Sequence, residues 1–212
     1  ALIMTHSDDQ GLVLPPNLAP HQVVVVPIYR GEDERSLVLD AASKLTKSLR
    51  DAGIRVHLDD RDTHKPGFKF NEYELKGVPL RIGLGPKDIE KGSVELARRD
   101  NLTKEFVPQN GLATHIVSLL DEIQQNLYNR ALQFREEHIT EVETYEDFQK
   151  VLNEKGGFIS AHWDGTTETE NKIKQETKAT IRCIPMRNIS ETGVCVYSGA
   201  PSNQRVLFAK AY

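Results

Sequence analysis

The sequence has little cysteine, no long apolar run and no large excess of charge of either sign. Its two cysteines cannot form a disulfide framework, so we expect reduced thiols in a cytoplasmic protein. The longest apolar stretch, VVVVPI at residues 23–28, is far shorter than the roughly 20 residues of a membrane span. The formal net charge of −4 argues against a general nucleic-acid binder, which would be strongly basic. These shortages exclude a membrane-spanning protein and a disulfide-stabilised secreted domain.

Signals for catalysis are also missing. The histidines are scattered without metal-ligand spacing, at positions 6, 21, 57, 64, 115, 138 and 162. Neither cysteine lies in a nucleophile motif, and Gly83-Leu-Gly85 lacks the third glycine of a dinucleotide-binding loop. The sequence therefore predicts no catalytic residue in this chain.

The pattern of apolar residues predicts two domains. A chain of 212 residues is long enough for one full domain and a smaller one. In the first part, a continuous β-branched run typical of a buried strand is followed by alternating helical and strand patterns. The expected elements are strands at 22–28, 54–60 and 79–85, helices at 33–53, 66–77 and 111–139, and a hairpin-like pair, SVELARRD and TKEFVP. This alternation predicts an α/β fold with a mixed, mostly parallel sheet flanked by helices.

After Thr140 the elements become shorter and richer in Thr and Glu. We expect helices near 145–155 and 168–177, and strands in GGFISAHWDG, ATIRCIP and RVLFAKAY. This second part reads as a small α+β domain.

One segment stands out for its chemistry, RDTHKPGFKFNEYELKGVPLRIGLGPKD at residues 61–88. It gathers cations, carboxylates and aromatics around a strand that should end at an exposed loop. Residues 61–105 carry ten Lys or Arg against eight Asp or Glu. Proteins that read RNA by sequence stack unpaired bases on aromatic or guanidinium planes and hydrogen-bond their edges. The segment therefore predicts a polar recognition surface that is compatible with RNA.

A plainer interpretation fits the same residues. Phe70 and Leu75 can be helix core, and Arg81 can pair with Glu72 or Glu74 in a surface ion pair that contributes little. From the residues alone, both interpretations stay open.

A family resemblance favours recognition. KFNEYELKGVPLRI followed by GPKD, RCIP at 182–185, GVCVYSGAP at 193–201 and the terminal FAKAY resemble the carboxy-terminal part of prolyl-tRNA synthetase of the archaeal and eukaryotic type. The resemblance covers essentially the whole chain. It implies a catalytic-domain tail and linker at 1–15, an anticodon-binding domain at 16–138 and a C-terminal domain at 139–212.

The resemblance also implies what the full-length protein does. It would attach proline to proline tRNA with ATP and Mg²⁺, as a homodimer formed through its catalytic domain. The chain starts inside the apolar run ALIM without an initiator methionine, so we expect a piece of a larger protein that is inactive alone.

The expected partner is the anticodon stem-loop of proline tRNA, whose anticodons carry two adjacent guanines in this family. A guanine presents two N–H donors beside a carbonyl acceptor, so a carboxylate can accept from the donors and a Lys or Arg side chain can donate to the carbonyl oxygen. The resemblance favours these roles for Glu74, Arg81 and Lys87. Phe70, with Phe68 and Tyr73, is a candidate stacking residue, and the cations Arg61 and Lys104 are candidate phosphate contacts.

The family's final domain often holds zinc through four cysteines. The resemblance aligns those positions with Asp164, Thr169, Cys195 and Ser198. Only one thiolate remains, and Thr and Ser are poor zinc ligands, so we predict no structural zinc. Cys183 lies outside this set and should be a small buried hydrophobe. The terminal tyrosine, Tyr212, should dock, because chain ends fray unless they are tied down. The resemblance implies that it reaches toward the catalytic domain, and packing on the final sheet stays open as the alternative.

Two functions of other classes stay open. One is a stand-alone doubly wound domain that binds a small phosphorylated ligand at its strand ends. The other is a protein-interaction module.

Overall fold

The computed structural model describes residues 1–186 and 190–210, and the chain divides into two compact units. Unit 1 is Ala1–Ala131 and unit 2 is Leu132–Tyr212. The division falls within the long helix α5 (Leu112–Glu137), a little before the boundary after residue 138 that the sequence suggests. Within the described ranges, no helix is both long and apolar enough to cross a membrane.

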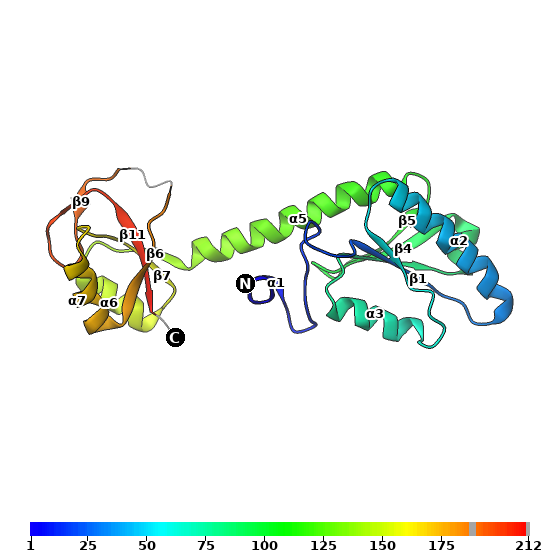
Figure 1. Cartoon of the computed structure of the whole chain (residues 1–212), viewed down its shortest axis with the longest axis horizontal. Helices are drawn as coiled ribbons and strands as arrows, with labels where there is room; N and C mark the ends of the chain where they lie inside the picture. Colours follow the sequence, from blue (N-terminus) through cyan, green and yellow to red (C-terminus); the bar gives the residue numbers. More distant parts are fainter. Residues whose placement is uncertain (187–189, 211–212) are drawn as a thin grey trace. The chain divides into compact units, whose positions relative to one another are not determined.

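Unit 1 is an α/β domain (Figure 1). Its helices before α5 are α1 (Leu2–His6), α2 (Glu32–Asp51), α3 (Pro66–Leu75) and α4 (Pro86–Lys91). Its strands are β1 (Val23–Pro27), β2 (Val56–Leu58), β3 (Leu80–Leu84), β4 (Ser93–Arg98) and β5 (Lys104–Pro108). The α/β class and the β4–β5 hairpin confirm the sequence predictions. The stretch expected as a turn after β3 is the short helix α4, in which the Asp88 side chain accepts a hydrogen bond from the Gly85 amide.

The five strands form one mixed sheet in the order β2-β1-β3-β4-β5. β1 lies parallel to both β2 and β3, whereas β4 is antiparallel to β3 and to β5. Two of the four strand pairs are therefore antiparallel, in a sheet that the sequence predicts to be mixed and mostly parallel. The chain between β3 and β4, which holds only the short helix α4, and the chain between β4 and β5 are both too short for the crossover that a parallel pair needs.

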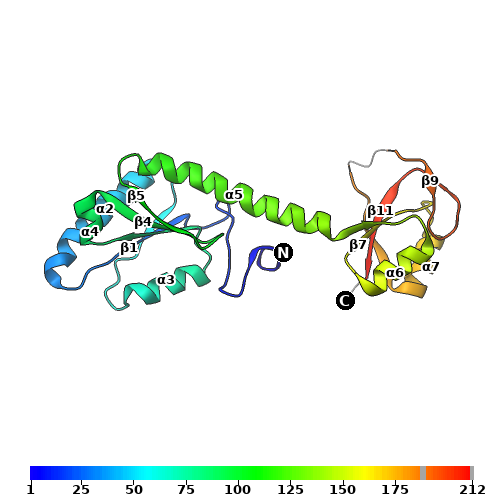
Figure 2. The same cartoon turned by 180° about the vertical axis from the view of Figure 1, so that it is seen from behind.

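Alternate residues of the strands face two different helical layers, because successive side chains point to opposite faces of a sheet. Val23, Val25 and Ile82 pack in the main core with residues of α2 and α5. Val24 and Val26 face the other way and pack against α3. Figures 1 and 2 show α3 on one face of this sheet and α2 with α5 on the other. The face that α3 lies on is here named the α3 face.

The chain before β1 is bound to the C-terminal end of α3. The amide of Leu12 donates to the carbonyl of Leu75, and that of Leu14 donates to the carbonyl of Gly77. Gly77 has a φ of 71°, and a Cβ atom there would lie 2.4 Å from the Leu12 carbonyl oxygen. No other residue fits such a close backbone contact without displacing it.

Unit 2 is the small α+β domain that the sequence predicts. Its elements are β6 (Ile139–Glu141), α6 (Tyr145–Glu154), β7 (Phe158–His162), α7 (Thr167–Thr177), β8 (Ala179–Cys183), β9 (Gly193–Val194), β10 (Pro201–Ser202) and β11 (Arg205–Lys210). The main sheet has the order β6-β7-β11-β8, and β11 is antiparallel to both neighbours. Phe148 and Phe208 meet edge to face at 5.2 Å in its core.

One prediction for unit 2 is wrong, and one lies outside the described residues. Cys183 is exposed at the end of β8, an edge strand whose last two positions face solvent. The expected docking of Tyr212 concerns a residue outside the described ranges.

Candidate nucleic-acid interface

The candidate interface lies on the α3 face of unit 1, where β3 and β4 emerge from beneath α3. Residues paired across neighbouring strands share a face. The pairs Arg81 with Ala97 and Gly83 with Glu95 therefore place these four side-chain positions together on the α3 face. A small recess here is named the Arg81 recess; it is lined by Phe70, Tyr73, Glu74, Val78, Arg81, Ala97, Arg98 and Arg99.

Arg81 is almost completely buried, with 4% of its surface exposed. Its guanidinium lies 3.7 Å from the centre of the Phe70 ring, and its Nη1 donates to Glu95 at 3.1 Å. Its Nε and Nη2 are buried and have no hydrogen-bond partner among the described residues. Buried N–H groups without partners are rare in native proteins, because leaving them unpaired costs about 1–3 kcal/mol each.

The guanidinium of Arg81 extends along β3 toward the strand's C-terminal end. A Cβ atom on Gly83 would lie 3.7 Å from Nη1 of Arg81 and 3.3 Å from a methyl group of Ile28. A Cβ atom at position 83 would therefore touch the guanidinium at an ordinary van der Waals distance and crowd the Ile28 methyl group. The sequence shows Gly83 as part of an incomplete dinucleotide loop, but the structure places it in β3 beside the guanidinium of Arg81.

Glu74 lines the same recess from the last turn of α3 and is partly buried. It stands one helical turn after Phe70, so both side chains lie on the flank of α3 that faces Arg81. No hydrogen bond or ion pair involves its carboxylate in the described part of the chain. The recess thus holds an unpaired carboxylate next to unpaired cationic donors.

Lys87 lies apart from this pair. It is an exposed residue of α4, which follows the far end of β3 from Arg81. Lys104 is also exposed, on the edge strand β5, in register with Ala97. Neither ammonium group has an ion-pair partner among the described residues. Of the three residues assigned to the guanines, Glu74 and Arg81 line the same recess. Lys87 does not line it, although the Arg81 side chain extends along β3 toward the end of the strand that α4 follows.

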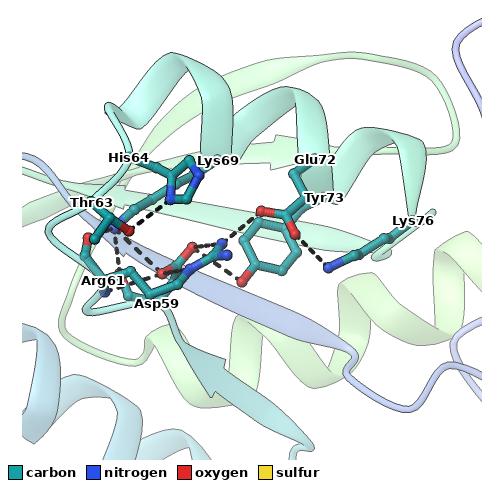
Figure 3. Close-up of polar contacts among 8 residues, drawn as sticks. All are labelled: Asp59, Arg61, Thr63, His64, Lys69, Glu72, Tyr73 and Lys76. Carbon is teal, nitrogen blue, oxygen red and sulfur yellow. Dashed lines mark hydrogen bonds and ion pairs between the residues drawn. The ribbon is translucent and has the colours of Figure 1, made fainter.

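Arg61 belongs to a separate ion network on the other flank of α3 (Figure 3). Its Nη2 donates to Asp59 at 2.7 Å and to Glu72 at 2.6 Å, and Lys69 lies 3.4 Å from the Asp59 carboxylate. Asp59 is fully buried and also accepts from the Tyr73 hydroxyl at 3.1 Å.

The network fixes the charge of its members. Burial alone would raise the pKa of Asp59, but hydrogen bonds from Arg61 and the charge of Lys69 hold it well below its usual range. The hydrogen bond to Asp59, with that to Glu72, raises the pKa of Arg61. Arg61 is therefore already paired with two carboxylates before any phosphate approaches, unlike Lys87 and Lys104.

In unit 2, three of the four degenerate zinc positions form a hydrogen-bonded cluster, here named the Asp164 cluster. The Asp164 carboxylate accepts from the hydroxyls of Thr169 at 2.7 Å and Ser198 at 2.6 Å. It also accepts from the amide and hydroxyl of Thr166, the N-cap of α7. Cys195 is buried nearby in sequence, and its amide donates to Ala200.

The cluster keeps Asp164 ionised. Burial raises its pKa, but hydrogen bonds from Ser198, Thr169 and Thr166 outweigh burial and hold the pKa well below the ordinary range. Hydroxyl groups donate to the carboxylate, whereas zinc would require thiolates or imidazoles. No group of three or more His, Cys, Asp or Glu side chains within the described ranges is arranged to hold a metal ion. The donor set at these four positions does not fit zinc.

Comparison with known proteins identifies both units. The family model for the anticodon binding domain matches residues 22–119, and the model for the C-terminal domain of prolyl-tRNA synthetase matches residues 145–212. Proteins named proline–tRNA ligase are similar along the whole chain, with 62% identity in Christiangramia forsetii, 54% in Porphyromonas gingivalis and 55% in Roseiflexus sp.. This chain belongs to the prolyl-tRNA synthetase family.

The chain spans 43–44% of the length of these relatives, and the alignments cover all of its residues. The relatives named here are bacterial, whereas the motifs of the sequence resemble the archaeal and eukaryotic type of prolyl-tRNA synthetase. The resemblance to the family is confirmed, and so is the presence of an anticodon-binding domain followed by the family's C-terminal domain.

Two side chains that support the recess escaped the sequence analysis. Glu95 is the ionic partner of Arg81, and Arg99 donates from Nε to the backbone carbonyl of Glu74 at 2.9 Å. Both Nη atoms of Arg99 also donate hydrogen bonds to the Asp8 carboxylate, at 2.8 and 2.6 Å. The sequence places Asp8 in a linker. The alternation of β4 puts residues 95 and 97 on one face, and Arg99 follows directly after the end of that strand.

Proposed function

We propose that this chain recognises the anticodon of proline tRNA through the Arg81 recess, as part of a protein that attaches proline to that tRNA. The observation that carries the proposal is the pairing of unsatisfied groups. Arg81 keeps two buried N–H donors without partners, and the carboxylate of Glu74 lines the same recess without one. A guanine edge, with two donors and one acceptor, complements both.

The chemistry assigns each group a role. Glu74 accepts the two N–H groups of the guanine edge, and Arg81 donates to its carbonyl oxygen, both through charge-assisted hydrogen bonds. Lys87 serves the neighbouring guanine or its phosphate from α4. Lys104 contacts a phosphate, which adds affinity and salt dependence but no base identity. Arg61 can also contact a phosphate, but it would do so while it keeps its hydrogen bonds to Asp59 and Glu72.

Binding includes an opening step. The recess as it stands has room for at most about one water molecule, and the Phe70 ring covers the Arg81 guanidinium. A base reaches Arg81 when Phe70 rotates away from it. The rotated Phe70 ring can then stack on the base whose edge Glu74 and Arg81 bind, a contact that RNA-binding proteins commonly use.

The full-length protein would bind ATP and Mg²⁺ and join proline to the tRNA through residues that lie outside this chain. The chain alone is proposed to bind RNA without aminoacylating it. The bound partner is the anticodon stem-loop, and the full-length protein is proposed to act in the cytoplasm as a homodimer.

The test compares guanosine with inosine, which lacks the exocyclic amino group, in the anticodon stem-loop of proline tRNA. A hydrogen bond to a charged group contributes about 1.5–3 kcal/mol. Fluorescence anisotropy with the wild-type chain should show this loss on replacing the recognised guanosine with inosine. In Glu74→Gln the loss should fall to about 0.5–1.5 kcal/mol, because a neutral amide oxygen accepts a weaker hydrogen bond from the amino group than a carboxylate does.

Glu90→Gln is the matched control, because Glu90 is an exposed carboxylate of α4 with no ion-pair partner in the described part of the chain. It should keep the wild-type preference for guanosine. Equal guanosine-to-inosine ratios in the wild type and Glu74→Gln would remove Glu74 from the proposed site.

A further inference from the structure

An aromatic side chain that the function above does not use lies open beside the Arg81 recess. Phe106, in the edge strand β5, has 70% of its surface exposed. Its strand partner is Glu95, which is the residue that holds Arg81. The ring therefore belongs to the same row across the sheet as Gly83 and Glu95.

Strand alternation decides which face the Phe106 ring occupies. The next residue, Val107, is buried in the main core with α2 and α5. Glu105, on the other side, lies 3.6 Å from His115 of α5. Phe106 points the opposite way from both, onto the α3 face. α3 packs over β1 and leaves the β5 edge of this face uncovered.

Two further observations describe the surroundings of Phe106. Lys104 lies two residues earlier, so it shares the face, and its ammonium group is exposed without an ion-pair partner among the described residues. The other exposed positions of β5, Lys104, Glu105 and Pro108, are polar or proline, and no other exposed large hydrophobic residue lies in this strand. A lone ring beside a free cation suits a base and its phosphate. A protein partner would need a contiguous patch of about 800 Å².

We propose that Phe106 stacks an unpaired nucleotide that neighbours the one held in the Arg81 recess, with Lys104 at its phosphate. The inference rests on the proposed function and extends the RNA path across the sheet from β3 to β5. Neighbouring strands lie about 4.8 Å apart, so Phe106 stands about 10 Å from the β3 row. Stacking tolerates any base, so this position adds affinity and not sequence preference.

The experiment measures binding of the 212-residue chain to the proline tRNA anticodon stem-loop by fluorescence anisotropy. Phe106→Ala should raise the Kd about 5- to 150-fold, the range for loss of one stacked base. Phe106→Trp should stay within about twofold of the wild type, since it keeps an aromatic plane. Tyr128→Ala is the matched control, because Tyr128 is an exposed aromatic of α5, 59% exposed, and should leave the Kd unchanged.

An abasic substitution at each loop position in turn identifies the stacked nucleotide. At one position the abasic loop should weaken binding by the wild type but not by Phe106→Ala, because the same contact cannot be lost twice. The unfolding midpoint of Phe106→Ala should equal that of the wild type, since its side chain is exposed.

The outcomes separate this inference from the function on which it rests. In one outcome, the wild type binds the stem-loop, Arg81→Ala binds it more weakly and Phe106→Ala binds it with the wild-type Kd. This outcome overturns the stacking site but leaves the proposal for the Arg81 recess in place. If Phe106→Ala changes only self-association in sedimentation, the ring is a protein contact and the inference is again overturned. If the wild type shows no affinity for the stem-loop, both proposals are overturned.

Discussion

Removing the carboxylate of the Asp164 cluster should destabilise unit 2 more than any exposed carboxylate of the same region. Asp164 accepts four hydrogen bonds, from Thr166 twice, from Thr169 and from Ser198. A hydrogen bond to a charged group contributes about 1.5–3 kcal/mol when it is buried, but three of these four are exposed, so we take about 0.5–1 kcal/mol for each. Asp164→Ala should then lower the free energy of unfolding by about 2–4 kcal/mol.

The assay follows the fluorescence of Trp163, the only tryptophan, during urea unfolding. Its indole donates to the Thr166 carbonyl at 3.2 Å, so its emission reports unfolding at the cluster. Asp164→Asn keeps one oxygen acceptor and should cost about half as much as Asp164→Ala. Glu168→Gln is the control, because Glu168 is exposed and its pair with Lys172 is a surface i,i+4 pair that contributes little to stability.

Acid should have the same effect as Asp164→Asn. The pKa of Asp164 lies well below its unfolded value of about 3.9, so its stabilisation is complete above about pH 4 and disappears as the pH falls further. The urea midpoint of the wild type should therefore decrease more steeply on acidification than that of Asp164→Asn. Equal costs for Asp164→Ala and Glu168→Gln, or parallel pH curves, would refute the reasoning.

Three further predictions concern ion pairs and metal. Glu95→Gln and Arg81→Met should be measured singly and together by urea unfolding. Their effects on the free energy of unfolding should be coupled by about 1–3 kcal/mol, because the two side chains form an ion pair. Effects that add within about 0.5 kcal/mol would contradict this. The hydrogen bond from Arg99 lowers the pKa of Asp8 to about 2, so Asp8→Asn should lack the stability that the wild type loses between about pH 4 and 2. Identical acid-unfolding curves would count against that link. Elemental analysis of the purified chain should find far less than one zinc per molecule, and stoichiometric zinc would show that Cys195 and its neighbours bind it after all.

The fold of unit 1 was largely predictable because its signals are local. The β-branched run of β1 and the amphipathic pattern of α5 are each strong over many residues. The proportion of parallel and antiparallel strand pairs was not predictable in the same way, because it depends on which strands pair across the sheet. The short connection between β4 and β5 was the only sequence feature that predicted antiparallel partners.

The candidate site was predictable in its residue types and not in its pairings. Glu74 and Arg81 share a recess, but Arg81 lies beneath Phe70 and is held by Glu95, 14 residues later in the sequence. Neither expected partner, Glu72 or Glu74, bonds to it. Such a contact depends on the register of β3 against β4, which a single sequence does not encode in any short motif.

The central claim is that this chain reads the guanines of the proline anticodon. The most direct measurement is the Kd of the chain for proline tRNA and for the same tRNA with both anticodon guanines replaced by adenines, at one fixed salt concentration. Adenine lacks the carbonyl and amino groups that Arg81 and Glu74 would bind, so the guanine anticodon should bind at least about tenfold more tightly. Equal affinity for the two RNAs would contradict the account.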